Sequence, residues 1–138
     1  MPLDFVQNDP VASARARRGL RSHLTGLAAE EAVARKYQAQ GYKILARRWR
    51  GAAGEVDIIA GKGDDLAIVE VKSARNHDIA AGYFGRAQQI RLGACAEEYL
   101  REIHLSARDP MTIVDMRFDL ALVDGLGRVD IAEAAFFL

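Results

Sequence analysis

The segment Gly54-Glu-Val-Asp-Ile-Ile-Ala-Gly-Lys-Gly-Asp-Asp-Leu-Ala-Ile-Val-Glu-Val-Lys-Ser73 decides the fold of this 138-residue chain. Its two apolar runs, residues 55–60 and 66–73, are rich in β-branched residues and are predicted to be strands. The link between them contains Gly63-Asp64, which suits a two-residue hairpin turn. The segment is therefore predicted to form a β-hairpin.

The expected turn also fixes which residues face each other across the hairpin. If the residues on either side of the turn pair, the numbers of opposed residues sum to 127, so Asp57 lies directly across from Glu70. Alternation along each strand adds Glu55 and Lys72 to the same face. The opposite face is expected to carry the apolar side chains of Val56, Ile58, Val69 and Val71.

Two opposed carboxylates create an electrostatic problem. At about 4 Å they repel by about 4 kcal/mol at an effective dielectric near 20. Lys72 can neutralise only one of them, and the remaining negative charge suits a hard cation with oxygen ligands, which favours Mg²⁺ or Mn²⁺. Zinc is not favoured, because the three histidines are scattered and Cys95 is alone.

A helix is predicted before the hairpin, over residues 24–40, with Thr25 as its N-cap and Gly41 as its stop. Helical periodicity places Glu30 in the middle of the stripe formed by Val33, Ala34 and Tyr37. A carboxylate on a core face needs a partner, because an unpaired buried charge costs several kcal/mol. Two interpretations remain open for Glu30, a salt bridge to an arginine at the rim of the core or a metal ligand.

The remaining elements complete an α/β pattern. Strands are predicted at 42–49, 117–123 and 128–131, a loop at 74–85, a helix at 86–104, a turn at 124–127 and an apolar tail after it. Cys95 lies on the core stripe of the second helix. A structural salt bridge between Arg117 and Asp119 is favoured over a role for Asp119 as a further acid of the site. The order predicts a mixed sheet flanked by helices.

Charge is distributed unevenly along the chain. Residues 1–50 carry ten Lys or Arg and four Asp or Glu, a net charge of +6, whereas residues 51–138 carry nine and fifteen, a net charge of −6. Of the 19 basic residues, 15 are arginine, which suits phosphate contacts, although an ordinary solvated surface is the simpler explanation. Residues 1–23 are predicted to be a flexible basic arm and residues 24–138 a single domain.

The chain lacks an apolar signal core and any apolar stretch near the ~20 residues that span a bilayer. Neither a membrane span nor export is expected. With a single cysteine there is also no disulfide framework, so a cytoplasmic location is expected.

The sequences GEVD (54–57) and IVEVK (68–72) resemble the PD-(D/E)XK nuclease signature. The segments TGLAAEE (25–31), GYKILA (41–46) and RFD (117–119) also follow the order and rough spacing of the YraN-like family of predicted endonucleases, which resemble archaeal Holliday junction resolvases. The resemblance covers residues 20–137. It implies a restriction-endonuclease-like three-layer sandwich with a mixed central β-sheet.

The resemblance also implies functional roles at matching positions. Asp57 and Glu70 would hold Mg²⁺ or Mn²⁺, Glu30 would add a ligand, and Lys72 would orient or activate the attacking water. Glu55 is a possible accessory acid. The implied activity is hydrolysis of phosphodiester bonds in branched or structured DNA, and symmetric cutting of two strands implies a homodimer.

Two positions depart from the family pattern. Gln88 stands where a lysine usually opens the second helix, and Arg75 lies one residue later than the usual basic residue. A glutamine keeps hydrogen bonding to phosphate but loses the charge. The alternatives are therefore a DNA-binding protein with little or no turnover, or a cross-strand ion network with only a structural role.

The end of the first predicted strand is a further candidate for nucleic-acid contact. Arg47, Arg48 and Arg50 surround Trp49, so the arginines could bind a phosphate backbone while the indole stacks on a base. An ordinary edge strand is the competing interpretation.

Overall fold

The computed structural model describes residues 26–73, 85–106 and 115–136. Helical structure covers residues 26–39, here called the amino-terminal helix, and α4 (Arg86–Ser106). The strands are β1 (Lys43–Arg50), β2 (Glu55–Lys62), β3 (Asp65–Ser73), β4 (Asp115–Val123) and β5 (Val129–Phe136). The predicted basic arm and Arg75 lie outside the described residues. Neither helix, as far as it is described, has the length and apolar character of a membrane span.

The five strands form one mixed sheet in the order β1-β2-β3-β4-β5. β3 and β4 are parallel, and the other neighbours are antiparallel. A parallel pair needs a long crossover connection, and α4 lies within it. This confirms the predicted α/β class.

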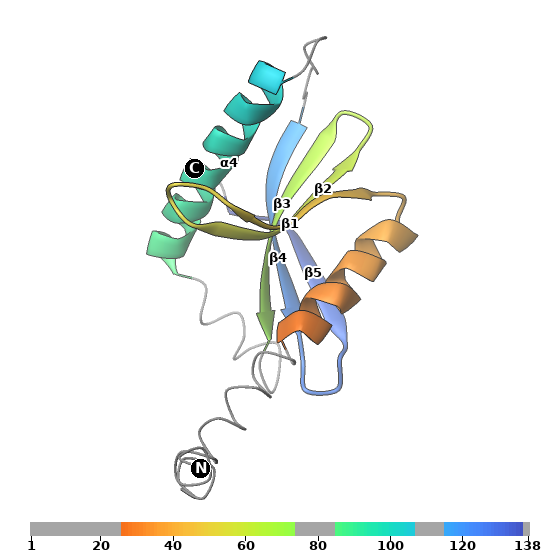
Figure 1. The fold of residues 1–138 in the computed structure, drawn as a ribbon. Helices are drawn as coiled ribbons and strands as arrows, with labels where there is room; N and C mark the ends of the chain where they lie inside the picture. Colours follow the sequence, from red (N-terminus) through yellow and green to blue (C-terminus); the bar gives the residue numbers. More distant parts are fainter. Residues whose placement is uncertain (1–25, 74–84, 107–114, 137–138) are drawn as a thin grey trace, which may run out of the picture.

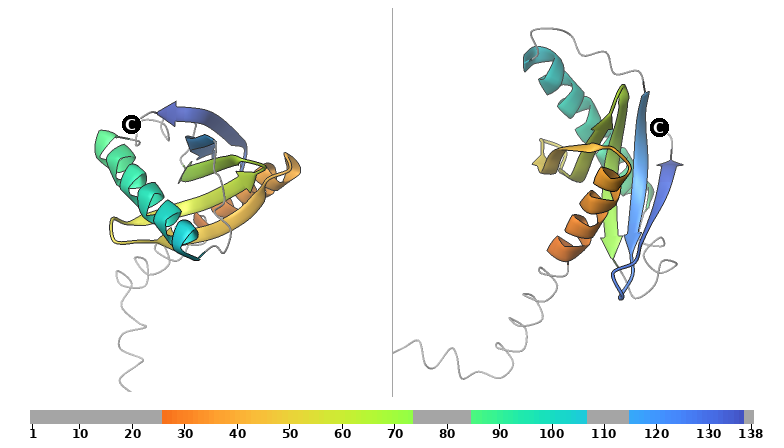
Figure 2. Two further views of the ribbon diagram at one scale, coloured as in Figure 1. Left: turned by 90° about the horizontal axis from the view of Figure 1, so that it is seen from above. Right: turned by 90° about the vertical axis from the view of Figure 1, so that its right-hand side faces the viewer.

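The two helices cover opposite faces of the sheet, which gives three layers (Figures 1 and 2). On one face the amino-terminal helix buries Val33, Ala34 and Tyr37 against apolar residues of β2, β3 and β4. On the other face α4 buries Leu92, Cys95 and Ala96 against a second apolar cluster. The stripe of the amino-terminal helix and the place of Cys95 in the core face of α4 are those that periodicity predicts, and Cys95 is a buried core residue.

The hairpin of β2 and β3 has the predicted register. Its pairs run from Lys62↔Asp65 to Ile58↔Val69, and the next pair along the same register is Asp57 with Glu70. The prediction that Val56 and Ile58 share a face is wrong, because they belong to different core clusters. The alternation breaks at Asp57, next to the end of the paired region, where its carboxylate accepts a hydrogen bond from the Val71 NH.

β1 is an edge strand with two irregularities. Its register with β2 shifts between Ile44 and Ala46, and Arg48 has a left-handed backbone with φ 49°. Arg48 lies opposite Asp57, between the pairs Arg47↔Ile58 and Trp49↔Val56. A left-handed conformation is strained for a residue with a β-carbon and is found preferentially at functional sites.

β5 is longer than predicted, because the apolar tail continues the strand to Phe136. Its pairing with β4 shifts between Phe118↔Phe136 and Leu120↔Ala132, and Ala134 in the bulge has φ 48°. The NH of Ala134 donates to Asp119 Oδ1 at 3.1 Å. The bulge interrupts the alternation of apolar residues, so the strand pattern cannot be recognised from the sequence.

Candidate active site

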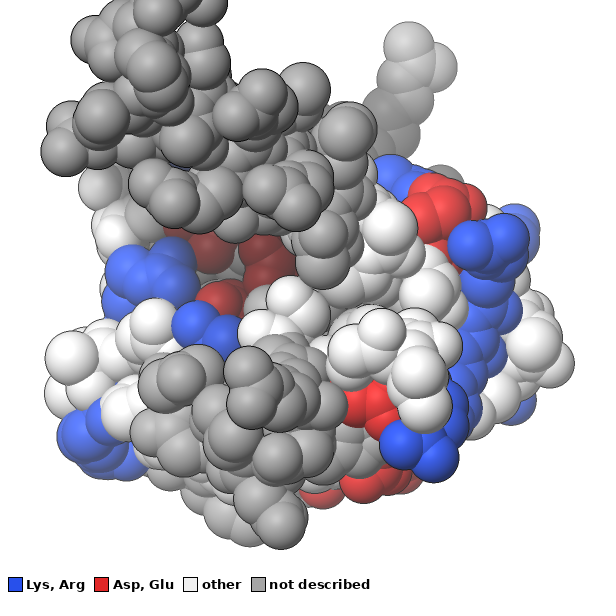
Figure 3. Space-filling view, turned by 90° about the horizontal axis from the view of Figure 1, so that it is seen from below, with Lys and Arg blue, Asp and Glu red and all other residues white. Residues whose placement is uncertain are grey.

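The candidate site lies where the β2–β3 pairing ends, between the two helices. Seen from this end of the sheet, acidic side chains are recessed in a hollow with Lys and Arg at its edge (Figure 3). A cavity of about 420 Å³ opens here between the amino-terminal helix and β1 and β2, and Glu30, Arg48 and Asp57 are among its lining residues. Asp57 lies here because of the antiparallel register of β2 and β3, and Glu30 lies here because of its position on the face of the amino-terminal helix that packs on the sheet.

Asp57 is partly buried and has one hydrogen bond from the main chain. The NH of Val71 donates to its Oδ2 at 2.8 Å. Burial raises the pKa of Asp57, the Val71 hydrogen bond opposes this, and the nearby carboxylates of Glu30 and Glu55 raise it further. Asp57 is thus an acid whose surroundings disfavour its charged form.

Glu70 is buried on the α4 side of β3, with 6% of the residue exposed. Burial and the negative charge of Asp57 raise the pKa of Glu70 to about 7, against the lowering effects of Lys72 and Arg91. Lys72 Nζ lies 3.6 Å from Glu70 Oε1, and Arg91 Nη2 lies 3.9 Å from Oε2. Among the described residues, the cations near Glu70 therefore lie 3.6 Å or more from its carboxylate oxygens.

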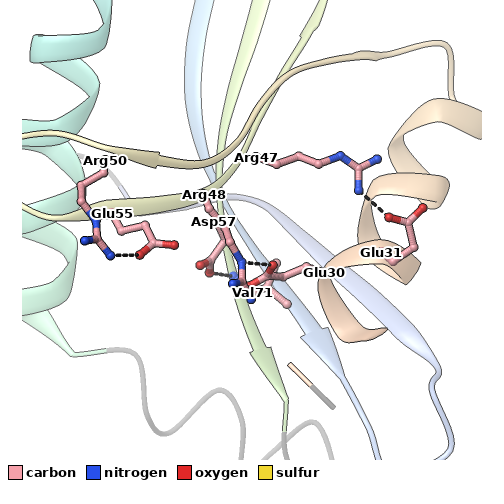
Figure 4. A network of polar contacts seen from close by, with 8 residues as sticks. All are labelled: Glu30, Glu31, Arg47, Arg48, Arg50, Glu55, Asp57 and Val71. Atoms are coloured by element: carbon pink, nitrogen blue, oxygen red, sulfur yellow. Dashed lines mark hydrogen bonds and ion pairs between the residues drawn. The ribbon is translucent and has the colours of Figure 1, made fainter. Parts of the chain in front are cut away.

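Glu30 forms a salt bridge to Arg48. Arg48 Nε lies 2.8 Å from Glu30 Oε2, and its Nη2 lies 3.4 Å from Oε1. Figure 4 shows Glu30, Arg48, Asp57 and Val71 gathered in one group. In the structure Glu30 is therefore paired with an arginine at the rim of the core, the first of the two interpretations. This pair lies beside Asp57.

The flanking acids also have their own arginines. Arg50 pairs with Glu55 at 3.3 Å, and Arg47 pairs with Glu31. These two pairs lie on either side of the central group in Figure 4. More positive charge therefore surrounds the acids than the sequence pattern indicated.

The fit of a divalent cation rests on Asp57 and Glu70. In the described ranges no three His, Cys, Asp or Glu side chains are arranged to hold a metal ion. Magnesium does not need such a cage, because it is commonly bound by one or two carboxylates, with water and substrate phosphate as further ligands. Asp57 raises the pKa of Glu70, and Lys72 and Arg91 lie 3.6 and 3.9 Å from the Glu70 carboxylate, which fits this type of site.

Trp49 and Gln88, two further residues considered from the sequence, are not part of the group around Asp57 in Figure 4. Trp49 is partly buried, packs against the α4 core cluster and lies edge-to-face with Tyr99 at 5.7 Å, which favours the interpretation of this segment as an ordinary edge strand. Gln88 is partly buried in the first turn of α4. Its Oε1 is buried without a hydrogen-bond partner among the described residues.

Arg91 is a site residue that the sequence pattern did not reveal. It lies one turn after Gln88 in α4, and its Nη1 donates to the Glu55 carbonyl at 2.9 Å. Gly54 leaves room for it, since a β-carbon there would lie 2.8 Å from Arg91 Nη1. The i, i+3 spacing from Gln88 was the available signal.

Asp119 belongs to a separate structural cluster. Tyr37 Oη donates to its Oδ2 at 2.6 Å, and Arg117 Nε lies 2.9 Å from its Oδ1. The predicted structural salt bridge between Arg117 and Asp119 is confirmed.

The comparison with known proteins identifies one family. The sequence profile of the uncharacterised protein family UPF0102 matches residues 29–123. A UPF0102 protein of Ruegeria pomeroyi is 48% identical over 123 residues, which is 89% of this chain and 96% of that protein. Relatives from Cereibacter sphaeroides (46% identity, 83% of this chain, 94% of the relative) and Dinoroseobacter shibae (45% identity, 86% and 85%) also match. The chain therefore belongs to the UPF0102 family, in agreement with the resemblance noted in its motifs.

Proposed function

We propose that this protein is a metal-dependent endonuclease that hydrolyses phosphodiester bonds in branched or otherwise structured DNA. The observation that carries the proposal is the pair of acids at the open end of the hairpin, where burial and Asp57 together raise the pKa of Glu70 to about 7. Such perturbation is typical of functional sites. The substrate class follows the resemblance to junction resolvases, and symmetric cutting would require a homodimer.

A bound Mg²⁺ or Mn²⁺ would offset charge on the scissile phosphate and lower the pKa of a coordinated water. Asp57 and Glu70 would hold the ion through one oxygen each or more. The Lys72 ammonium, 3.6 Å from Glu70 Oε1, would donate to the attacking water or to a phosphate oxygen. Arg48 would exchange its contact with Glu30 for one with the phosphate backbone.

A second candidate is a DNA-binding protein with little or no turnover. It is favoured by the salt bridges of Glu30 and Glu55, which leave two carboxylates rather than four for a metal. The glutamine at position 88 points the same way, because it lacks the charge of the usual lysine. In this case phosphate contacts would still give binding that weakens steeply with salt.

The deciding experiment uses purified full-length protein with four-way junction, duplex and single-stranded DNA in Mg²⁺ or Mn²⁺. The test variant is Asp57→Ala with Glu70→Ala. The matched control is Asp64→Asn, which removes an exposed acid at the closed end of the same hairpin. We expect the wild type and the control to cut the junction and the double variant to leave it intact.

Each outcome separates the candidates. Cutting that persists in the double variant would exclude this site as the source of activity. Salt-sensitive binding without cutting would establish the second candidate. Absence of both binding and cutting would contradict both candidates and leave the ion network as a structural feature.

A further inference from the structure

The turn between β4 and β5, residues 124–128, presents an apolar side chain to solvent. Leu126 at its tip is 80% exposed, more than any other large hydrophobic residue in the described ranges. Two glycines flank it, and Gly127 has φ 79°, which suits glycine. A single exposed leucine is common on protein surfaces, so its significance depends on how it is held and where it lies.

The turn holds Leu126 rigidly. Asp124 Oδ1 accepts hydrogen bonds from the NH groups of Leu126 and Arg128, both at 2.9 Å, and Arg128 Nε donates to Oδ2 at 2.6 Å. The hydrogen bond from the Arg128 NH is the main cause that lowers the pKa of Asp124. Lys36 Nζ also donates to the Val129 carbonyl at 2.8 Å, which ties the turn to the amino-terminal helix. A tip held in this way loses little conformational entropy when it binds.

The turn lies at the same end of the sheet as the candidate active site. In the parallel pairing of β3 and β4, Glu70 is opposite Leu120 and Lys72 is opposite Leu122. The turn begins at Asp124, four residues after Leu120. At about 3.3 Å per residue, it therefore starts about 13 Å along the strand from the level of Glu70. Figure 1 shows the end of β3, the start of the amino-terminal helix and this turn together at the lower end of the molecule.

We propose that Leu126 is an apolar wedge that contacts unstacked bases beside a branch point in DNA. The inference rests on the proposed function, because it takes the scissile phosphate to lie at Asp57 and Glu70. Stacked bases are about 3.4 Å apart, so a turn that starts about 13 Å along the strand from Glu70 begins about four base steps from that phosphate, and Leu126 at its tip lies farther out. Leucine is among the side chains that insert between base steps and partly unstack them.

The charge of the turn is compatible with this partner. Asp124, the acidic residue of the turn, is neutralised by Arg128, so the turn does not present an unpaired negative charge to the phosphate backbone. Insertion is easiest where base pairing is already interrupted. The wedge therefore predicts preference for branched DNA over continuous duplex, a specificity that the carboxylates alone do not supply.

The test compares Leu126→Ser with Leu45→Ser, each in the full-length Asp57→Asn background so that no DNA is cut. Leu45 is a matched control, because it is also exposed, at 44%, but lies at the β1 irregularity between the pairs Ile44↔Ala60 and Ala46↔Ile59, nearer the closed end of the hairpin. Binding to a four-way junction and to duplex of the same length is measured by fluorescence anisotropy. A 2-aminopurine base at the branch point reports unstacking.

We expect Leu126→Ser to weaken junction binding about tenfold, to leave duplex binding unchanged and to abolish the rise in 2-aminopurine fluorescence. Leu45→Ser should behave like the Asp57→Asn parent. Equal junction affinity and equal fluorescence in both variants would overturn the wedge, even if the wild type cuts DNA. Loss of junction preference in Leu126→Ser without cutting by the wild type would support the wedge and contradict the nuclease. If the parent binds no DNA, both proposals fail.

Discussion

Asp119 and Glu70 are buried acids on neighbouring strands, but their surroundings are opposite. Asp119 is fully buried and accepts hydrogen bonds from Tyr37, Arg117 and the Ala134 NH. Glu70 has described cations at 3.6 and 3.9 Å, from Lys72 and Arg91, and a pKa raised to about 7. A buried charge is tolerated when it is satisfied, so the first cluster stabilises the sheet, whereas under the proposed function the second would be available to bind an ion.

The largest expected difference between the Glu70 and Asp119 clusters is in catalysis. Glu70→Gln keeps the shape of the side chain but removes a charge that would hold the cation, so cleavage of junction DNA should fall by about 10⁴-fold. Asp119→Asn should retain cleavage within about tenfold at temperatures where it is folded. Initial rates with protein in excess measure both. A Glu70→Gln enzyme as active as Asp119→Asn would remove the distinction between the clusters.

Stability should respond in the reverse order. Asp119→Ala leaves the Arg117 guanidinium, the Tyr37 hydroxyl and the Ala134 NH without their shared acceptor, so unfolding free energy should fall by about 3–5 kcal/mol. Glu70→Ala should cost less than about 1 kcal/mol, because Lys72 and Arg91 are partly exposed and can rehydrate. Urea denaturation monitored by circular dichroism checks this. Equal losses would show that Glu70 is as structural as Asp119.

The pH dependence of stability sharpens the contrast. The pKa of Glu70 rises from 4.5 to about 7 on folding, so the folded state holds the proton more tightly. Stability should therefore be highest below pH 4.5 with respect to this group and fall as pH rises to about 7, by up to about 3 kcal/mol. Glu70→Gln should lack this fall and exceed the wild type in stability at pH 8. Parallel urea curves of the two proteins from pH 5 to pH 8 would contradict the assignment.

Metal binding should give the smallest effect. At a Mg²⁺ concentration ten times its Kd, binding to the folded state adds about 1.4 kcal/mol, which raises the melting temperature by a few degrees. The increase should weaken below pH 7, because protons compete for Glu70. Asp57→Asn should lack the increase and Asp119→Asn should keep it. A similar shift in Asp57→Asn would place the ion elsewhere.

The sequence predicted the elements whose signals are local. The Gly63-Asp64 turn gave the register that brings Asp57 opposite Glu70, and helical periodicity placed Glu30 beside the sheet. Two-residue turns and apolar stripes depend on neighbouring residues alone. The structure agrees with these predictions for that reason.

The features that were missed depend on distant partners. The bulge at Ala134 exists because Asp119, fifteen residues earlier, accepts its NH. The left-handed Arg48 turns the strand so that Arg47 and Arg48, consecutive in β1, both pair with the amino-terminal helix. Strand periodicity places consecutive side chains on opposite faces and cannot anticipate this.

The parallel pairing of β3 with β4 has a consequence for the order of folding. Asp57 and Val71 are 14 residues apart in a hairpin that can close in about 1–10 μs, whereas Tyr37 and Asp119 are 82 residues apart across the crossover. Long-range pairing forms late, because the chain loses loop-closure entropy before the long-range contacts can stabilise it. The paired acids thus meet first in water, where their repulsion is about 1 kcal/mol. The acids would then lose their water when the helices dock on the sheet, and under the proposed function a bound cation would be expected to speed that step.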